Sequence, residues 1–353
     1  MSRISSNEIW LVMDSRQFGG IETHLLQLAL GLVKHQQKVR VWLTHRYAVP
    51  SPLIAKLESH DIDYGYLNDN HSQPLFQLIE LVKQYQPQVV HCHGYKASLI
   101  GKLARCVTCT RQVSTYHAGE TPTGRVKLYD FLDRYTAWLS TASIVVSQAI
   151  ASKLPCQTHH FNNFIDTSEI AFQHGSQIAF VGRLSNEKAP HHFVQLAHDF
   201  PEHDFHLYGD GPLSDKLKQN SSPNLTFHGH QKEMAQVWPN IDVLIISSEF
   251  EGLPLVAIEA MARGINVIST AVGDIPNLID SPFNGLLVKD GTQLKRALKE
   301  YLAFSPSSIM ALRVNAANTI AHHYSSTHVI PNMLSLYAIS PFSDSQTDSQ
   351  FEN

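Results

Sequence analysis

Two glutamates, Glu251 and Glu259, lie eight positions apart in the second half of the sequence, with Pro254 between them. Proline suits the first turn of a helix, because its ring fixes φ and it has no N–H group to satisfy. The amides of Leu253 and Leu255 would then point outward from a helix N-terminus, where an anion such as phosphate binds. Glu259 lies beyond that turn, so compensation of the helix dipole explains it poorly. We therefore predict a phosphate site below Glu251, with Glu259 facing a neighbouring group such as a ribose diol.

Two cations, Arg183 and Lys188, lie five positions apart in an expected loop that follows a strand ending at Gly182. A diphosphate gains negative charge as the bond to it breaks, and fixed arginine and lysine side chains can neutralise that charge. An arginine and a lysine in a surface loop are usually only solvated, so the loop is informative only together with the predicted phosphate site.

Glycines follow two other expected strands. Gly19 and Gly20 lie between the first strand and the first helix, where they would let the backbone approach a bound group closely, although they do not form the dinucleotide-binding Gly-x-Gly-x-x-Gly pattern. Residues 209–212 (Gly-Asp-Gly-Pro) occupy a corresponding turn in the second half, which fits a ligand loop or a tight turn equally well.

The elements that must position these residues alternate between short apolar runs and amphipathic segments of helical length, as in parallel sheets with crossover helices. Helices are expected over 21–34, 74–85 and 95–107. The expected strands are 8–13, 39–43, 64–67, 89–92, 111–116 and 143–146, then 178–181, 204–208, 225–228, 243–246, 267–269 and 285–288. The fold class is therefore α/β, with two doubly wound, Rossmann-like parallel-sheet domains whose strand carboxyl ends face a common cleft.

The domain boundaries follow from length and charge. The chain has 353 residues, enough for two such domains, and its first 165 residues carry 16 Lys and Arg against 11 Asp and Glu, whereas the remainder carries 11 against 20. We expect one Rossmann-like domain over 1–165, a second, ligand-binding domain over 166–325, and a helix over 326–339 that could pack back on the first domain. Residues 340–353 are rich in Ser, Asp and Gln and are expected to be disordered.

Composition excludes several classes of protein. Hydrophobic residues are 43% and charged residues 16% of the chain, which is globular composition. The apolar run over 9–13 is too short for a membrane span or a signal peptide, so we expect a cytoplasmic protein. The four cysteines are too few and too scattered for a disulfide framework, and Cys106 and Cys109 lack the second pair of ligands that zinc needs.

Taken together, these motifs resemble the retaining GT-B-fold glycosyltransferases of the large fourth family, the glycosyl transferases group 1. The Glu-x7-Glu pattern is the most specific part, followed by Gly-Arg-Leu with the later lysine. The resemblance implies that Arg183 and Lys188 bind the diphosphate of a nucleotide-sugar donor, that Glu259 binds its ribose hydroxyls, and that Glu251 with adjacent backbone binds the transferred sugar. It also implies that Gly19 and Gly20 line the opposite side of the cleft, near the donor phosphate and the acceptor.

The same resemblance makes 1–165 the acceptor-side domain and 166–325 the nucleotide-sugar-binding domain, and it assigns roles to two histidines in the first half. His117 follows an expected strand, where family members have a histidine that contacts the donor sugar near the reacting carbon, and His93 follows another, where it could face the acceptor. A solvated or hydrogen-bonded side chain is the usual state of any one of the 21 histidines. In the expected hinge over 161–166, Phe164 and Ile165 replace the Gly-Val pair of the family pattern, which leaves the geometry of domain closure open.

The activity that the resemblance implies is retaining transfer of a sugar to a glycan or lipid-linked glycan, as in polysaccharide or lipopolysaccharide synthesis. It implies no metal ion and no cofactor beyond the nucleotide sugar, and nothing indicates a nucleic-acid partner. Asp61 and Asp63 spell the Asp-x-Asp of metal-dependent sugar transferases, but their position far from the diphosphate motifs favours surface acids. Two alternatives remain: a nucleotide-sugar 2-epimerase, expected to lack Glu-x7-Glu, and a non-catalytic nucleotide-sugar-binding scaffold, expected to have lost His117, Arg183 or Glu251.

A basic stretch raises the question of a membrane. Its helix over 95–107 is expected to bury its leucine, isoleucine and valine positions and to point Lys102 and Arg105 into solvent. Such a surface could attract an anionic membrane or a phosphate-bearing acceptor, or it could simply be solvated. The six basic residues, which are accompanied by the single acid Glu120, are Lys96, Lys102, Arg105, Arg111, Arg125 and Lys127.

Overall fold

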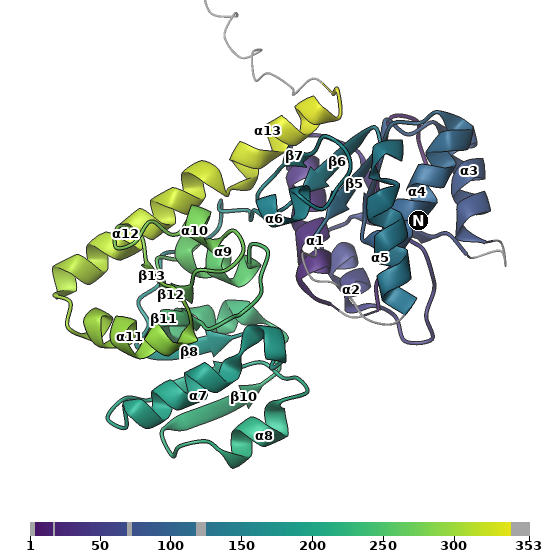
Figure 1. Cartoon of the computed structure of the whole chain (residues 1–353). Helices are drawn as coiled ribbons and strands as arrows, with labels where there is room; N and C mark the ends of the chain where they lie inside the picture. The colour runs from purple at the N-terminus through teal and green to yellow at the C-terminus, as the bar shows by residue number, and fades with distance from the viewer. Residues whose placement is uncertain (1–3, 17, 69–72, 118–124, 340–353) are drawn as a thin grey trace, which may run out of the picture.

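The computed structural model describes residues 4–16, 18–68, 73–117 and 125–339, which form two parallel sheets, each covered by helices (Figure 1). The predicted α/β class and the two doubly wound domains are confirmed. The expected tail over 340–353 lies outside the described residues. None of the helices in the described part is long and apolar enough to cross a membrane.

The first sheet has seven strands in the order β3-β2-β1-β4-β5-β6-β7. Its strands are β1 (Ile9–Met13), β2 (Val39–Leu43), β3 (Asp63–Tyr66), β4 (Val89–His93), β5 (Gln112–Tyr116), β6 (Ala142–Val145) and β7 (His159–His160). Its helices are α1 (Gly20–Lys34), α2 (Pro52–Ser59), α3 (Pro74–Tyr85), α4 (Tyr95–Thr108), α5 (Arg125–Tyr135) and α6 (Gln148–Ala151).

The second sheet has six strands in the order β10-β9-β8-β11-β12-β13. Its strands are β8 (Gln177–Val181), β9 (Phe205–Tyr208), β10 (Leu225–Gly229), β11 (Ile241–Ile246), β12 (Asn266–Thr270) and β13 (Leu286–Val288). The helices that follow β8 are α7 (Pro190–Asp199), α8 (Ser214–Gln219), α9 (Leu255–Ala262), α10 (Ile275–Leu278), α11 (Leu294–Leu302), α12 (Pro306–His323) and α13 (Ser326–Leu336).

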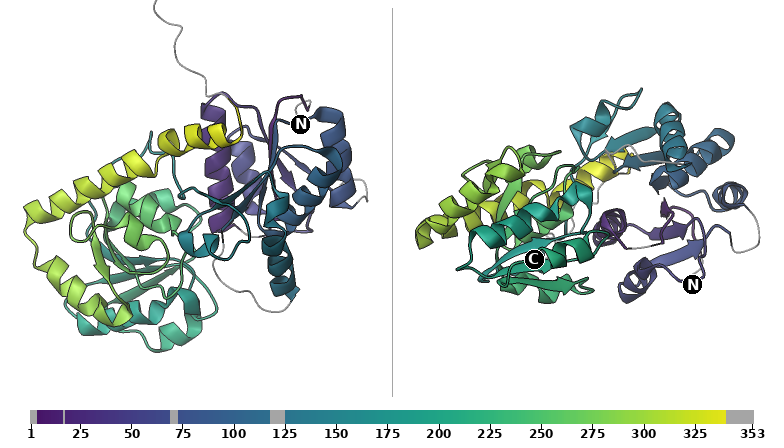
Figure 2. Two further views of the ribbon diagram at one scale, coloured as in Figure 1. Left: turned by 45° about the horizontal axis from the view of Figure 1, so that its top comes forward. Right: turned by 60° about the horizontal axis from the view of Figure 1, so that its bottom comes forward.

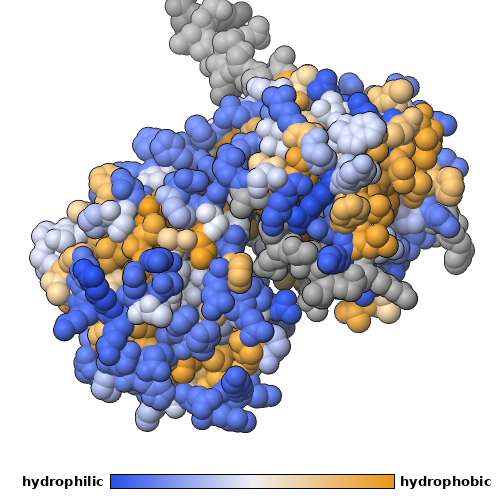
Figure 3. Space-filling model, in the orientation of Figure 1, coloured by the Kyte–Doolittle hydropathy of each residue, from blue (hydrophilic) through white to orange (hydrophobic). Residues whose placement is uncertain are grey.

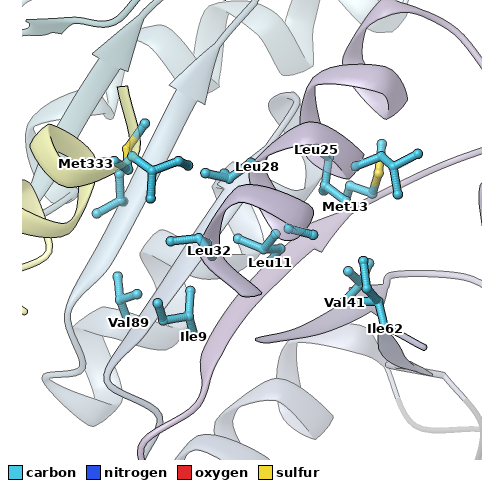
Figure 4. Close-up of a cluster of buried hydrophobic side chains, with 14 of the residues drawn as sticks. Ile9, Leu11, Met13, Leu25, Leu28, Leu32, Val41, Ile62, Val89 and Met333 are labelled. Carbon is cyan, nitrogen blue, oxygen red and sulfur yellow. The ribbon is translucent and has the colours of Figure 1, made fainter. Parts of the chain in front are cut away.

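The core of the first domain forms where α1 lies on β1. Every residue of β1 is buried, as expected for a central strand with helices on both faces of its sheet. Leu25, Leu28 and Leu32 fall on one side of α1 and pack against Leu11 and the other buried side chains of this cluster (Figure 4).

The chain ends by returning to the first domain. Helices α12 and α13 run along one side of the two lobes and bridge them (Figure 2). On α13, Ile330 and Met333 are buried in the core of the first domain. A Cβ added at Gly31 of α1 would lie 2.7 Å from the Cγ1 atom of Ile330, so this glycine lets the two helices approach closely. Beside this contact, Ile165 and Ser325 form a parallel bridge where the chain crosses between the lobes.

Candidate active site

The strand orders place a reversal of direction in each sheet, between β1 and β4 and between β8 and β11. Ligands of open α/β sheets bind in the crevice outside the carboxyl ends of strands at such a point. Six of the predicted residues lie at or after the carboxyl ends of these four strands. In the first sheet, Gly19 and Gly20 come after β1, and His93 is the last residue of β4. In the second sheet, Arg183 and Lys188 come after β8, and Glu251 comes after β11.

The loops after β8 and β11 are joined by hydrogen bonds. Lys188 forms an ion pair with Glu251, whose carboxylate also accepts a hydrogen bond of 2.8 Å from the hydroxyl of Ser248. The backbone N–H of Glu249 donates to the carbonyl oxygen of Glu187 at 2.9 Å. Arg183 is exposed at the edge of the same loop. The structure thus brings Lys188, one of the two predicted diphosphate cations, to the predicted sugar-binding glutamate.

The start of α9 differs from the expectation. Pro254 has φ −72° and ψ 124°, which is extended backbone, so it is the N-cap residue and the helix begins at Leu255 rather than at the proline. The carbonyl oxygen of Leu253 accepts a hydrogen bond of 2.6 Å from the side-chain amide of Asn163, in the predicted hinge. The hydrogen bond from Asn163 therefore fixes the turn that leads into α9. The helix begins one residue later than predicted.

Glu259 lies half-buried on α9, one turn before Arg263. Burial raises the pKa of Glu259, although Arg263 and the indole of Trp238 favour its charged form. The guanidinium of Arg263 lies 5.5 Å from the centre of the Trp238 ring and donates a 2.7 Å hydrogen bond to the carbonyl oxygen of Glu259. A carboxylate in this setting is poorly solvated and well placed to accept hydrogen bonds from hydroxyl groups.

The turn after β9 packs directly on the loop that carries Arg183 and Lys188. Gly209 has φ +140°, and a Cβ on it would lie 1.8 Å from the carbonyl oxygen of Gly182. The amide of Leu184 donates to the carbonyl oxygen of Asp210 at 3.0 Å. Glycine is required at 209 because the two loops touch backbone to backbone, which supports the tight-turn alternative.

On the first domain, Gly19 caps α1 and Gly20 begins it, and both are exposed. The N–H of Gly19 donates to the carboxylate of Glu22 at 3.1 Å. Among the residues that the structure describes, none lies within 4 Å of a Cβ added at Gly20.

Three histidines meet at this end of the sheet. The Nδ1 atom of His93 lies 3.1 Å from the Nε2 atom of His117, and the ring of His24 lies 4.6 Å from that of His117. Burial lowers the pKa of His24 to about 4, and it also lowers the pKa values of His93 and His117 well below their usual range. All three rings are therefore neutral near pH 7.

His24 was not predicted. The sequence carries a signal for it, because His24 lies one helical turn after Gly20 and so faces the same end of α1. The structure also contains two groups of side chains that could hold a metal ion. Within the described ranges, the ligand atoms of each group lie within 4.8 Å of one another. One group is His24 with His93 and His117, and the other is His191 with His192 and Glu249. Sequence spacing alone did not reveal either group, since each draws on more than one element.

A cavity of about 250 Å³ opens beside His93 and His117. Its wall includes Asp14 and Lys96, which form an ion pair of 2.6 Å. Burial opposes ionisation of Asp14, but hydrogen bonds from Lys96 and Tyr47 outweigh it and lower its pKa. The cavity is thus lined by charged groups that already have partners, and none of its acids was predicted.

The two domains meet at the predicted site. A Cβ added at Gly252, in the loop after β11, would lie 3.6 Å from the carbonyl oxygen of His117, in the loop after β5. On the other side of the crevice, the ammonium of Lys56 lies 4.0 Å from the carboxylate of Glu233. The loop that carries Glu251 therefore lies against the backbone of His117.

The expectation for the basic stretch is wrong in its central detail. Lys102 is buried, with its ammonium 2.5 Å from the carboxylate of Asp133, whereas Leu103 and Val107 are exposed. The helix packs through its small residues instead, and a Cβ added at Gly101 would lie 2.3 Å from the sulfur of Cys92. This close contact turns the lysine inward and the larger apolar side chains outward.

Other charges of the stretch also have partners inside the domain. Arg105 donates to the carbonyl oxygen of Leu139 at 3.0 Å, and Arg111 donates to that of Leu336 at 3.4 Å. Elsewhere, Asp63 lies 3.5 Å from the guanidinium of Arg40 at the edge of the first sheet. Its position there, with Asp61 exposed before β3, agrees with surface acids.

Two family models match the chain in tandem: Glycosyltransferase Family 4 over residues 18–168 and Glycosyl transferases group 1 over residues 175–303. The chain belongs to the glycosyl transferases group 1 family. The resemblance to the GT-B glycosyltransferases of this family is confirmed, and the protein is an enzyme, a glycosyltransferase.

Two relatives from Escherichia coli are named as glycosyltransferases. The UDP-Gal:alpha-D-GlcNAc-diphosphoundecaprenol alpha-1,3-galactosyltransferase of Escherichia coli is 24% identical over 254 residues, which cover 61% of this chain and 66% of that enzyme. The O-antigen biosynthesis glycosyltransferase WbnH of Escherichia coli is 21% identical over 341 residues, which cover 86% of this chain and 94% of that protein.

Solved structures share the GT-B fold. The crystal structure of Anabaena HepE in complex with UDP-glucose has a TM-score of 0.78 at 18% identity, covering 93% of this glycosyltransferase and 99% of that chain. The crystal structure of TarM has a TM-score of 0.78 at 12% identity, covering 94% of this chain and 98% of that one. At these identities the likeness shows the fold alone.

Proposed function

We propose that this glycosyltransferase moves a sugar from a nucleotide diphosphate-sugar to a lipid-linked glycan, with retention of anomeric configuration, during synthesis of a surface polysaccharide or lipopolysaccharide. The observation that carries the proposal is the pairing of Lys188 with Glu251, in a loop whose Gly252 lies against the backbone carbonyl of His117 in the other domain. This arrangement holds a cation for the leaving group and a carboxylate for the sugar within one site.

The leaving group is the first chemical problem. As the bond between the sugar C1 atom and the phosphate oxygen breaks, the nucleoside diphosphate takes the electron pair and gains charge. Arg183, Lys188 and the N–H groups at the start of α9 neutralise it. Without donor, Lys188 pairs with Glu251. When the diphosphate binds, the lysine changes partner and the glutamate is released to accept hydrogen bonds from sugar hydroxyls.

The acceptor is the second problem. In the front-side scheme, its hydroxyl attacks C1 from the face that the diphosphate leaves, and its proton passes to the departing phosphate oxygen. His117 hydrogen-bonds the donor sugar and His93 faces the acceptor, both as neutral rings, because their depressed pKa values prevent protonation near pH 7. A neutral ring orients hydroxyl groups without adding positive charge beside a carbon that becomes oxocarbenium-like.

The nucleotide is held by Glu259 through the ribose hydroxyls, and Gly19 and Gly20 allow the donor phosphate and acceptor to approach the first domain. The reaction needs neither a metal ion nor a cofactor in this scheme, since the fixed cations carry the leaving-group charge. The lipid-linked acceptor is supported by the diphosphoundecaprenol named in the Escherichia coli relative. Such an acceptor requires the enzyme to work at the inner face of a membrane.

The decisive experiment incubates the purified full-length chain with a panel of nucleotide sugars and follows release of free nucleoside diphosphate, with and without lipid-linked acceptor. We expect slow release without acceptor, fast release with it, and a product whose anomeric configuration, read by NMR, matches the donor. An epimerised nucleotide sugar with no free diphosphate would instead identify an epimerase. Binding of nucleotide sugar without any turnover would identify a scaffold.

The matched variants are Arg183→Ala as the test and Lys216→Ala as the control, because Lys216 is an exposed residue on α8 of the same domain. Turnover should fall only for the first. A product of inverted configuration would retain the transferase but overturn the proposed retaining mechanism.

A further inference from the structure

Helix α5 carries a continuous apolar stripe on its outer side. Leu128, Phe131, Leu132 and Tyr135 recur at intervals of three and four residues, so they lie along one face of the helix, and all four are exposed. Trp138 continues the stripe in the short helix over 137–139 and is 63% exposed. Figure 3 shows hydrophobic residues gathered over α4 and α5.

The exposed apolar side chains extend from α5 onto a neighbouring helix. Phe131 is 60% exposed and its ring stacks on that of Tyr135, with 5.9 Å between the ring centres. On the neighbouring helix α4, Leu103 and Val107 are exposed as well. Contiguous apolar surface of this kind marks an interaction site.

The inner side of α5 has the opposite character. Asp130 and Arg134 form an ion pair of 3.0 Å, and Asp133 pairs with the buried Lys102. These three residues of α5 also line the cavity beside His93 and His117. One helix therefore presents its polar side to the predicted acceptor cavity and its apolar side to the exterior.

We propose that the α5 stripe, defined as Leu128, Phe131, Leu132, Tyr135 and Trp138, inserts into the interfacial layer of a lipid bilayer. The inference rests on the proposed function, because a lipid-linked acceptor reaches the cavity only from a membrane. Aromatic and aliphatic side chains on one face of a helix suit the interface between head groups and acyl chains. A bilayer held by the outer side of α5 lies next to the cavity that its inner side lines.

Apolar insertion, and not charge, drives this contact. The lysines and arginines described along α4 have partners within the domain: Lys96 with Asp14, Lys102 with Asp133, and Arg105 with a backbone carbonyl. Among the side chains of α5 that the structure describes, Lys127 is an exposed cation, and one charge contributes only about 1 kcal/mol to attraction by an anionic membrane. Binding should therefore persist on neutral vesicles and at high salt.

The tryptophans offer a direct reporter. The sequence contains four, and three are buried: Trp10 is 0%, Trp42 is 5% and Trp238 is 1% exposed, whereas Trp138 lies in the stripe. A blue shift of the emission on adding vesicles, and quenching by brominated lipids, would therefore report insertion of Trp138. Trp138→Phe should abolish both signals while leaving the protein bound.

The experiment uses the full chain and vesicles of phosphatidylcholine, with and without phosphatidylglycerol. We expect sedimentation with both kinds, and a loss of binding of about one to two orders of magnitude in Phe131→Ser combined with Trp138→Ser. The control is Phe283→Ser, because Phe283 is 56% exposed in the second domain. Thermal unfolding midpoints should be unchanged in all variants, since the replaced side chains are exposed.

Two results would overturn the proposal. Binding confined to anionic vesicles and lost at high salt would indicate electrostatic attachment, and a dimer that the same variants disperse without lipid would indicate a second copy of the chain on the stripe. Donor turnover separates this proposal from the proposed function. If the wild type transfers sugar but does not bind vesicles, only the proposal that the stripe inserts into a bilayer is wrong. If it binds vesicles but releases no nucleoside diphosphate, only the proposed sugar transfer is wrong.

Discussion

Replacing Lys188 by alanine acts differently on the free enzyme and on the transition state. In the free enzyme, the change removes the ion pair with Glu251. The side chain of Lys188 is 25% exposed and that of Glu251 is 10% exposed. Pairs that retain contact with water contribute about 1 kcal/mol or less to stability. The hydrogen bond from Ser248 to Glu251, at 2.8 Å, remains in place. The unfolding midpoint should therefore fall by less than about 3 °C.

In the transition state, the same lysine faces a diphosphate that is taking up a full negative charge. Two opposite charges about 4 Å apart attract by about 4 kcal/mol at an effective dielectric constant of about 20. Removal of one fixed stabiliser of a developing charge commonly costs about 3 kcal/mol, because its neighbours compensate in part. We therefore expect kcat of Lys188→Ala to fall about a hundredfold.

The assay measures nucleoside diphosphate release under saturating donor, together with KM and the unfolding midpoint, for wild type, Lys188→Ala and the control Lys216→Ala. A fall in kcat with an unchanged midpoint assigns the lysine to the leaving group. Turnover of Lys188→Ala within about threefold of wild type would falsify the role of this loop in the mechanism. Loss of activity together with unfolding would show that the pair with Glu251 is structural.

Three further predictions concern other parts of the molecule. Transfer should persist in excess chelator, and complete loss that magnesium or manganese restores would return attention to Asp61 and Asp63. Burial lowers the pKa of His24 from 6.5 to about 4, so between these pH values the unfolded chain binds a proton that the folded chain does not. The free energy of unfolding, measured in urea titrations, should therefore fall by about 3 kcal/mol as the pH drops from 6.5 to 4. His24→Phe should remove this part of the pH dependence. Lys102→Met should cost about 3–5 kcal/mol of unfolding free energy by leaving Asp133 buried without its cation, and adding Asp133→Leu should restore most of it.

The fold was predictable because strand and helix periods are properties of local sequence. All twelve expected strands form, with ends displaced by at most two residues. The two-residue strand β7 was missed, because its histidines are exposed and carry no apolar signal. The prediction for α4 also chose the wrong buried face. It placed the larger apolar side chains inward, whereas the helix packs closely at Gly101 and buries the side that carries small residues.

The site was predictable only in part. Arg183, Lys188 and Glu251 could be proposed from the sequence because the family pattern is local and each residue follows a strand. The contact of His24 with His117 joins residues 93 positions apart, and its existence depends on how α1 lies over the sheet. The cavity beside His93 likewise depends on how α5 packs against α4, so no single segment of the sequence predicts it.

The return of the chain through α12 and α13 makes the second domain an insertion within the first. Residues on α13, such as Ile330, belong to the core built by α1, so the first sheet cannot complete its packing until the last helix has been synthesised. Both crossings between the lobes lie side by side at Ile165 and Ser325. A chimera that exchanges donor specificity between relatives must therefore replace the segment between these two points as a cassette, because joining two halves at one point would separate α13 from the domain that it completes.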